Sequence, residues 1–246
     1  MSEENDLQQS HVIDFISKKK DNDRIAQVQD YNLDIEANHV YLFGEESYIG
    51  EDLGPEGEPG VEFSMANRFI KNLNILMRKS NNPILIHMKT CGGDWNEGMA
   101  IYDAIRACPN PTTILNYTHA RSMSSIIFQA ANKRVMMPNS HFLIHDGTLA
   151  YSGTQKQTIS FVEWYKRTEP IMLGIYADSM EREGKFKGNP RKAILDFLRV
   201  KMDAKEDVYW TAKQTVTLGL ADEIFGHDGK YDWSKLLKYT KEELTR

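Results

Sequence analysis

Hydrophobic and polar positions follow two periodicities along this chain. Short apolar runs, rich in aliphatic and aromatic residues and typical of strands, occur at residues 39–44, 84–88 and 112–118 and around 135 and 142. Between these runs, apolar residues recur every three or four positions, which predicts helices after Ser64 as N-cap, over 95–107 and over 123–132. Strands that alternate with helices in this way indicate βαβ units with right-handed crossovers, and therefore an α/β fold.

The second half of the chain is predicted to be mainly helical. A helical pattern runs from about 155 to 183, and Pro170 should kink or interrupt it because proline lacks the backbone N–H. Another helix is expected over 191–202. Thr211 opens a capping-box pattern (TAKQ), and Gly219 fits the position that ends this last short helix.

The core domain is expected over 35–225, with two segments outside it and one loop inserted within it. Residues 1–34 are polar and charged, as in a mobile N-terminal arm. Residues 45–62 are acidic and rich in Gly and Pro, which predicts an exposed loop, either a solvated insertion or a partner-binding loop. Residues 226–246 are expected to fold back as a C-terminal tail.

Composition excludes several classes of protein. A chain of 246 residues with 41% hydrophobic content can bury one good core. The net charge of −5 and the pI of about 5.8 give no electrostatic case for binding nucleic acid or an anionic membrane. No apolar run approaches the roughly 20 residues that a membrane span requires. Two cysteines, Cys91 and Cys108, form no disulfide framework, so a reducing, cytoplasmic location is expected.

Candidate chemistry centres on Ser122, which is predicted to lie at a turn from strand to helix. A hydroxyl at a helix N-terminus lies beside backbone N–H groups that have no intrahelical partner and that can stabilise an oxyanion. The next apolar run, after the turn PNS, ends at His145, and a serine with a nearby base is a candidate nucleophile. Spacing alone does not choose among His119, His141 and His145 as that base. No metal-ligand spacing with Cys or Glu accompanies these histidines.

Gly92 and Gly93 occupy a similar turn after the strand at 84–88. Two glycines can simply permit a tight turn, or they can let an N–H approach a substrate carbonyl closely. The second interpretation is favoured because Ser122 follows at the next turn of the same kind. Cys91 is expected to pack at the strand end, since no cationic motif adjoins it.

Four stretches of the chain, in order, resemble the ClpP family, the proteolytic subunit of the Clp protease: GGDWNEGMAIYDAI, ARSMSS, PNSHFLIH and DVYWTAKQTVTLGLADEI. The resemblance spans roughly residues 38–225. It implies the ClpP/crotonase-like spiral of βαβ units, with a protruding handle helix in the region 155–202.

The same motifs imply residue roles. Ser122 would be the nucleophile, His145 the general base and Asp207 the acid that orients the histidine. Gly93 and Met123 would supply the N–H donors of the oxyanion hole, and no metal or organic cofactor is implied. From the sequence alone, Asp203, Glu206 and Asp207 are all candidates for the acid, and only the distance to the Gly219-Leu220 landmark of the motif favours Asp207.

The implied function is a serine endopeptidase that cleaves unfolded polypeptides or peptides inside a ring-shaped homo-oligomer. The ring would be a heptamer or a tetradecamer in which the handle joins two rings, and a AAA+ unfoldase would be the partner. The N-terminal segment would then line the axial pore. Two alternatives stay open: a catalytically silent ring subunit or scaffold, and a crotonase-type acyl-CoA enzyme.

Some positions depart from the family pattern. Arg121 and Ser124 replace a small residue and a glycine on either side of the nucleophile, and both could narrow or recharge the site. Glu206 replaces an arginine that pairs across the two rings. Leu85 and His87 stand where the family has aromatic docking residues for the unfoldase.

Overall fold

The computed structural model describes residues 18–44, 59–226 and 233–236. Its strands are β1 (Leu33–Asp34), β2 (His39–Phe43), β3 (Ile84–Thr90), β4 (Thr112–Arg121), β5 (Lys133–Met136), β6 (His141–Ile144), β7 (Val208–Thr211) and β8 (Glu223–Ile224). They form one eight-stranded sheet in the order β1-β2-β3-β4-β5-β8, and β6 branches from it by pairing with β4 and β7. Only the β1–β2 and β6–β7 pairs are antiparallel among these strands. The parallel centre is what βαβ units produce.

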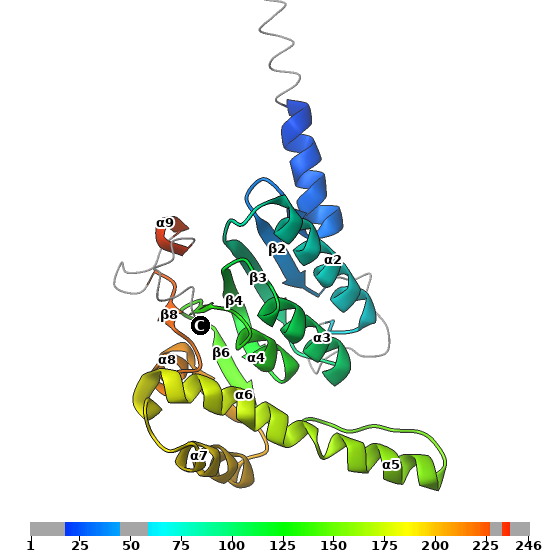
Figure 1. Ribbon diagram of the computed structural model, residues 1–246, viewed down its shortest axis with the longest axis vertical. Helices are drawn as coiled ribbons and strands as arrows, with labels where there is room; N and C mark the ends of the chain where they lie inside the picture. The colour runs from blue at the N-terminus through cyan, green and yellow to red at the C-terminus, as the bar shows by residue number, and fades with distance from the viewer. Residues whose placement is uncertain (1–17, 45–58, 227–232, 237–246) are drawn as a thin grey trace, which may run out of the picture.

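The helices of the core lie largely on one face of this sheet (Figure 1). From residue 63 onward, the described helices are α2 (Phe63–Lys79), α3 (Trp95–Arg106), α4 (Met123–Phe128), α5 (Gln155–Tyr165), α6 (Thr168–Arg182), α7 (Arg191–Ala204), α8 (Ala212–Leu218) and α9 (Trp233–Leu236), with a short 3₁₀ turn at Gly184–Phe186. Successive residues of a strand point to opposite faces. In β3, accordingly, Ile84, Ile86 and Met88 enter the main core beneath the helices, whereas Leu85 points to the other face.

On that other face, a smaller apolar cluster is covered by the C-terminal segment. Leu85, Leu115 and Val135 pack there with Leu236 of α9, which is fully buried. Of the predicted tail after Gly226, only residues 233–236 are described. The described part of the tail therefore lies against the sheet.

The expected α/β fold of βαβ units with a projecting helix is confirmed, but one long helix is replaced by two. The pattern at 155–183 forms α5 and α6, which are separated at residues 166–167. Pro170 lies in the first turn of α6, where a missing N–H costs no intrahelical bond. Figure 1 shows α5 extending away from the body of the molecule.

Two predicted helix boundaries are wrong. The N-cap of α2 is Glu62 and not Ser64, because the Glu62 carboxylate accepts from the N–H groups of Ser64 at 2.8 Å and Met65 at 2.6 Å. The helix expected over 123–132 ends at Phe128. By contrast, the Thr211 capping box and the left-handed Gly219 that ends α8 are as predicted.

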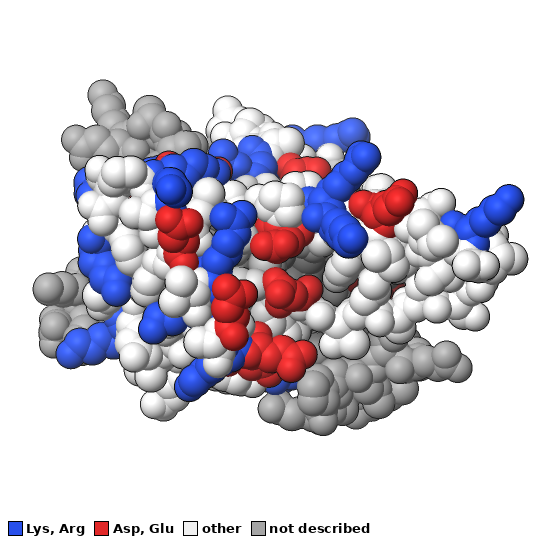
Figure 2. Space-filling model, turned by 90° about the horizontal axis from the view of Figure 1, so that it is seen from below, with Lys and Arg blue, Asp and Glu red and all other residues white. Residues whose placement is uncertain are grey.

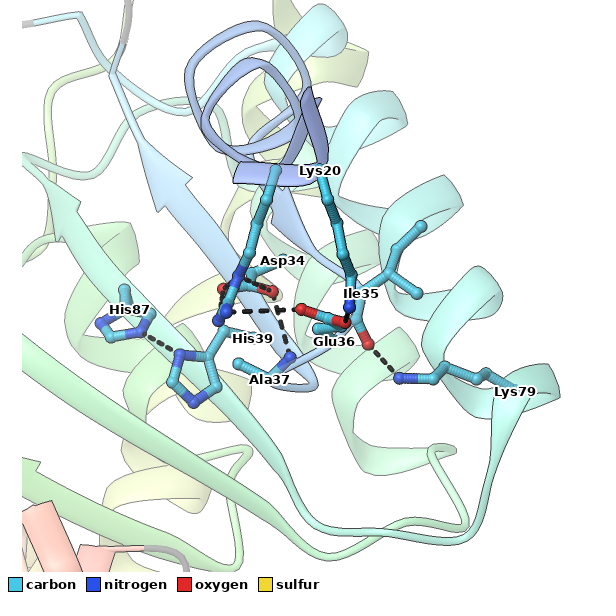
Figure 3. Close-up of polar contacts among 9 residues, drawn as sticks. Lys20, Asp34, Ile35, Glu36, Ala37, His39, Lys79 and His87 are labelled. Atoms are coloured by element: carbon cyan, nitrogen blue, oxygen red, sulfur yellow. Dashed lines mark hydrogen bonds and ion pairs between the residues drawn. The ribbon is translucent and has the colours of Figure 1, made fainter. Parts of the chain in front are cut away.

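Within the predicted N-terminal arm, residues 18–31 form a helix that stands out from the sheet (Figure 1). Arg24 binds Asp34 at 2.6 Å at the start of the sheet. Lys20 binds Glu36 at 2.6 Å nearby (Figure 3). These ion pairs attach the helix to the segment that precedes β2. The rest of the arm, residues 1–17, and most of the acidic loop, residues 45–58, lie outside the described residues.

A buried ion pair links β5 to the ends of α4 and α8. Arg134 of β5 binds Asp222 at 2.6 Å, and both side chains are at most 5% exposed. The guanidinium also donates to Gln129 at the end of α4 and to the carbonyl of Gly219 at the end of α8. The network therefore fixes the C-terminal ends of both helices relative to β5. No helix within the described ranges combines the length and apolarity of a membrane span.

Candidate active site

The sheet topology brings three of the predicted site residues to one edge. β4 and β6 run parallel, with Arg121 opposite Leu143 as their last pair, so Ser122 and His145 follow at the same end. β7 is antiparallel to β6 and places Val208 opposite Ile144. Asp207, one residue before Val208, is therefore opposed to His145. Neither Asp203 nor Glu206 has this position.

The side chains of these three residues are in contact. His145 Nε2 lies 2.8 Å from Ser122 Oγ, and His145 Nδ1 lies 3.2 Å from the Asp207 carboxylate. With its proton on Nδ1, the imidazole donates to Asp207 and accepts from the Ser122 hydroxyl. The side chain of His145 is 23% exposed and that of Asp207 is 48% exposed, so the contacts lie at a surface open to a substrate.

The backbone of Ser122 is strained, with φ of 52° and ψ of −131°. A non-glycine residue in such a conformation costs about 1–3 kcal/mol and persists only when its surroundings hold it. Ser122 is the N-cap of α4, yet its side chain makes no capping bond. The hydroxyl is instead turned toward His145.

The two predicted oxyanion donors lie on adjoining turns. The bridge between Val61 and Gly93 uses the carbonyl of Gly92 and the N–H of Asp94, so the N–H of Gly93 itself points away from Val61. A side chain at Gly93 would clash with the Val61 backbone. A Cβ on Gly92 would come within 2.8 Å of the Met123 nitrogen, which shows how closely the two turns pack.

Sequence reasoning missed the buried hydroxyls behind the turn. Ser125 donates to the carbonyl of Ser122 at 2.6 Å and lies 2.6 Å from the hydroxyl of Tyr176 on α6. Burial raises the pKa of Tyr176, so this phenol stays protonated. Because Ser125 gives its single hydroxyl hydrogen to the Ser122 carbonyl, the phenol is the donor in its contact with Ser125. In the sequence, Tyr176 is only one position of the helical pattern at 155–183, and nothing there indicates a contact with the turn.

Other candidates from the sequence lie elsewhere. His119 and His141 are neighbours near the first pair of β4 with β6, with ring centroids 5.5 Å apart, and His145 alone of the three is hydrogen-bonded to Ser122. Cys91 is buried at the end of β3. Within the described residues, no group of three or more His, Cys, Asp or Glu side chains is arranged to hold a metal ion.

Two carboxylates follow predicted site residues in the sequence and act on Tyr165. Burial, followed by the charges of Asp94 and Asp146, raises the pKa of Tyr165 at the end of α5. Asp94 follows Gly93 in the sequence, and Asp146 follows His145. Tyr165, the last residue of α5, therefore lies near the residues that follow Gly93 and His145.

In this α/β fold, a strained serine follows the end of a central parallel strand and is hydrogen-bonded to a histidine, which in turn contacts a carboxylate. This arrangement is that of a serine hydrolase. The model of the Clp protease family matches residues 58–228. The chain therefore belongs to the Clp protease family, as a divergent ClpP member.

Curated relatives carry the name ATP-dependent Clp protease proteolytic subunit. The chain is 32% identical to the protein from Streptococcus sanguinis over 169 residues, which are 67% of this chain and 80% of the relative. It is 28% identical to the proteolytic subunit 2 from Pseudomonas aeruginosa, over 67% of this chain and 77% of the relative. The ATP-dependent Clp protease proteolytic subunit from Deinococcus radiodurans is 26% identical, over 67% of this chain and 76% of the relative.

Proposed function

We propose that this protein is a serine endopeptidase that cleaves unfolded polypeptides within a ring-shaped homo-oligomer. The observation that carries the proposal is the 2.8 Å contact between Ser122 Oγ and His145 Nε2 at a strained turn. Membership of the Clp protease family and the proximity of Asp207 to the same histidine support it.

In this mechanism, Ser122 Oγ attacks the carbonyl carbon of the scissile peptide while His145 Nε2 takes the hydroxyl proton. His145 then gives that proton to the leaving amine, and the acyl group stays on Ser122. A water molecule, deprotonated by the same nitrogen, hydrolyses the ester and regenerates the serine. Asp207 holds the Nδ1–H tautomer and stabilises the imidazolium that forms in each half of the reaction.

The N–H groups of Gly93 and Met123 would stabilise the negative charge that develops on the substrate oxygen. Each donor of this kind contributes about 3 kcal/mol to the stability of a transition state. The glycine requirement at position 93 follows from the Val61 backbone, which leaves no room for a side chain.

Pairing of two such rings would give the projecting helix α5 a partner. None of its residues is buried in the single chain, although Ile159 and Trp164 are large and apolar. An isolated helix of 11 residues gains little stability from its backbone alone. We assign α5 to the contact between two rings, and an ATP-dependent unfoldase to the delivery of substrate.

The proposal is tested by hydrolysis of a labelled, unfolded polypeptide and of a short fluorogenic peptide. Ser122→Ala should abolish turnover of both, and Asp207→Asn should lower kcat by about 10²-fold or more, because the imidazole loses the group that holds its tautomer. Asp203→Asn is the matched control, since Asp203 is an exposed carboxylate on α7, and should leave kcat unchanged. Turnover that survives Ser122→Ala would refute the proposal. A folded but inert wild type would favour the silent ring subunit.

A further inference from the structure

The hydroxyl of Ser124, the second residue of α4, is turned back toward the end of β4. It accepts a hydrogen bond from the N–H of Arg121 at 3.0 Å and donates one to the carbonyl of Arg121 at 2.7 Å. Ser124 is fully buried, so water does not compete for either bond. One side chain thus binds both backbone polar groups of the residue that precedes Ser122.

The carbonyl of Arg121 lies where the sheet ladder ends. β3 pairs with β4 only as far as Thr90 opposite Ala120, whereas the N–H of Ser122 donates to Leu143 of β6. Backbone groups of successive strand residues point to opposite sides, so the Arg121 carbonyl faces the side on which β3 has just ended. The Ser124 hydroxyl supplies the donor that a further paired residue of β3 would have supplied.

The conformation of Ser122 depends on how its two flanking peptides are held. On the C-terminal side, the Ser122 carbonyl accepts from the N–H of Ser125 at 3.0 Å and from its hydroxyl at 2.6 Å. On the N-terminal side, the contact with Ser124 fixes the Arg121 backbone. The positive φ of Ser122 lies between these two restraints.

We propose that Ser124 is a positioning residue for the nucleophile. Its hydroxyl holds the backbone of Arg121 and thereby keeps Ser122 in the conformation from which Oγ reaches His145. This inference rests on the proposed function and deepens it: the side chain that replaces the family's glycine does not enter the site but supports the turn from behind.

The test compares Ser124→Ala and Ser124→Gly with Ser140→Ala in the full chain. Ser140 is a matched control because it is also buried and donates to the carbonyl three residues earlier, that of Met137, at 2.7 Å. It lies at the opposite end of β6 from His145. We expect kcat for a fluorogenic peptide to fall about 10- to 100-fold in both Ser124 variants, with KM changed less than about threefold. Ser140→Ala should keep kcat within about twofold of wild type, at a comparable loss of Tm.

An unchanged kcat in Ser124→Ala, or a loss confined to KM, would overturn the inference. A crystal structure of Ser124→Ala gives a readout that does not depend on turnover. We expect Ser122 to leave positive φ and its Oγ to move beyond about 3.5 Å from His145 Nε2, and an unaltered turn would count against the positioning role. Ser122→Ala is assayed alongside: if it remains active, the proposed function itself fails, whereas an inactive Ser122→Ala with a fully active Ser124→Ala rejects only the role of Ser124.

Discussion

Ser122 has a strained backbone because it must leave β4 and open α4 within a single residue. With this positive φ, the Ser122 N–H donates to the carbonyl of Leu143. The side chain is then free to contact His145 instead of capping the helix. The position of Ser122 at a strand end followed by a helix is visible in the sequence pattern, whereas His145 was predicted only by the resemblance to the ClpP family. The restraints from Ser124 and Ser125 were not predictable, because they depend on how the turn folds back on itself.

A pair of histidines away from the candidate site, His87 and His39, predicts how the stability of the fold depends on pH. His87 of β3 is buried, and one ring nitrogen contacts the Tyr117 hydroxyl at 2.8 Å. The other contacts His39 at 3.1 Å (Figure 3). Tyr41 stacks on the ring, with centroids 4.4 Å apart. Burial, and then the neighbouring His39, lowers the pKa of His87 to about 3. The imidazole is therefore neutral in the folded protein at ordinary pH.

The free energy of unfolding should consequently fall as the pH drops below about 6.5. In that range an unfolded histidine, with its ordinary pKa, binds a proton that the folded His87 does not bind, and this continues down to the folded pKa of about 3. We expect a loss of about 2 kcal/mol between pH 7 and pH 5 from this residue. Urea unfolding at both pH values measures it. His87→Gln should show a smaller pH dependence, and equal slopes for variant and wild type would contradict the assignment.

At the scale of elements, the sequence predicted the long apolar strands better than the short edge strands. The parallel centre of the sheet is visible in runs such as 84–88, because both faces of such strands are buried. β7 is only four residues long and alternates buried and exposed positions at the edge beside β6. The sequence offered three acids near its start, and the pairing of β7 with β6 is what brings Asp207 to His145.

The break between α5 and α6 was expected from Pro170 but misplaced. Proline tolerates the first helical turn, so it marks the beginning of α6 and not a kink within one long helix. The helix at residues 18–31 was likewise missed, because its sequence is polar and two of its basic side chains bind acids that lie beyond it. A helix held by such ion pairs has no periodic pattern of apolar residues in its sequence from which it could be predicted.

The buried ion pair between Arg134 and Asp222 makes a prediction about stability. Removing one member leaves the other charged group buried without its partner, so Arg134→Met should lower the free energy of unfolding by about 3–5 kcal/mol. The double variant Arg134→Met with Asp222→Leu should lose clearly less, because no charge is then stranded. Denaturant unfolding at one protein concentration measures both. A single variant as stable as wild type, or a double variant less stable than the single one, would contradict this role.

At the scale of the whole molecule, the projecting α5 is the feature that a single chain does not explain. Figure 2 shows this projection largely without charged side chains, whereas acidic and basic side chains are interspersed over the neighbouring surface. The exposed apolar side chains of Ile159 and Trp164 fit the proposed contact between rings.

Ile159→Glu combined with Trp164→Glu should therefore split the assembly into halves without unfolding the subunit, because both residues are exposed in the single chain. Native mass spectrometry and size-exclusion chromatography with light scattering measure the result. Val200→Glu is the matched control, since Val200 is 64% exposed on α7 and apolar but lies outside α5. An assembly of unchanged mass in the α5 variant, or equal dissociation in the control, would show that α5 does not join the rings.

If Ser122 is a nucleophile activated by His145, a fluorophosphonate should modify it, and the mass of the intact protein after treatment with this reagent measures that modification. Such a reagent phosphonylates a serine only where a base has activated the hydroxyl. We predict one adduct per chain on the wild type and on Ser140→Ala, and none on Ser122→Ala or His145→Ala. A folded, assembled wild type without an adduct, or an adduct that persists in Ser122→Ala, would mean that Ser122 is not an activated nucleophile.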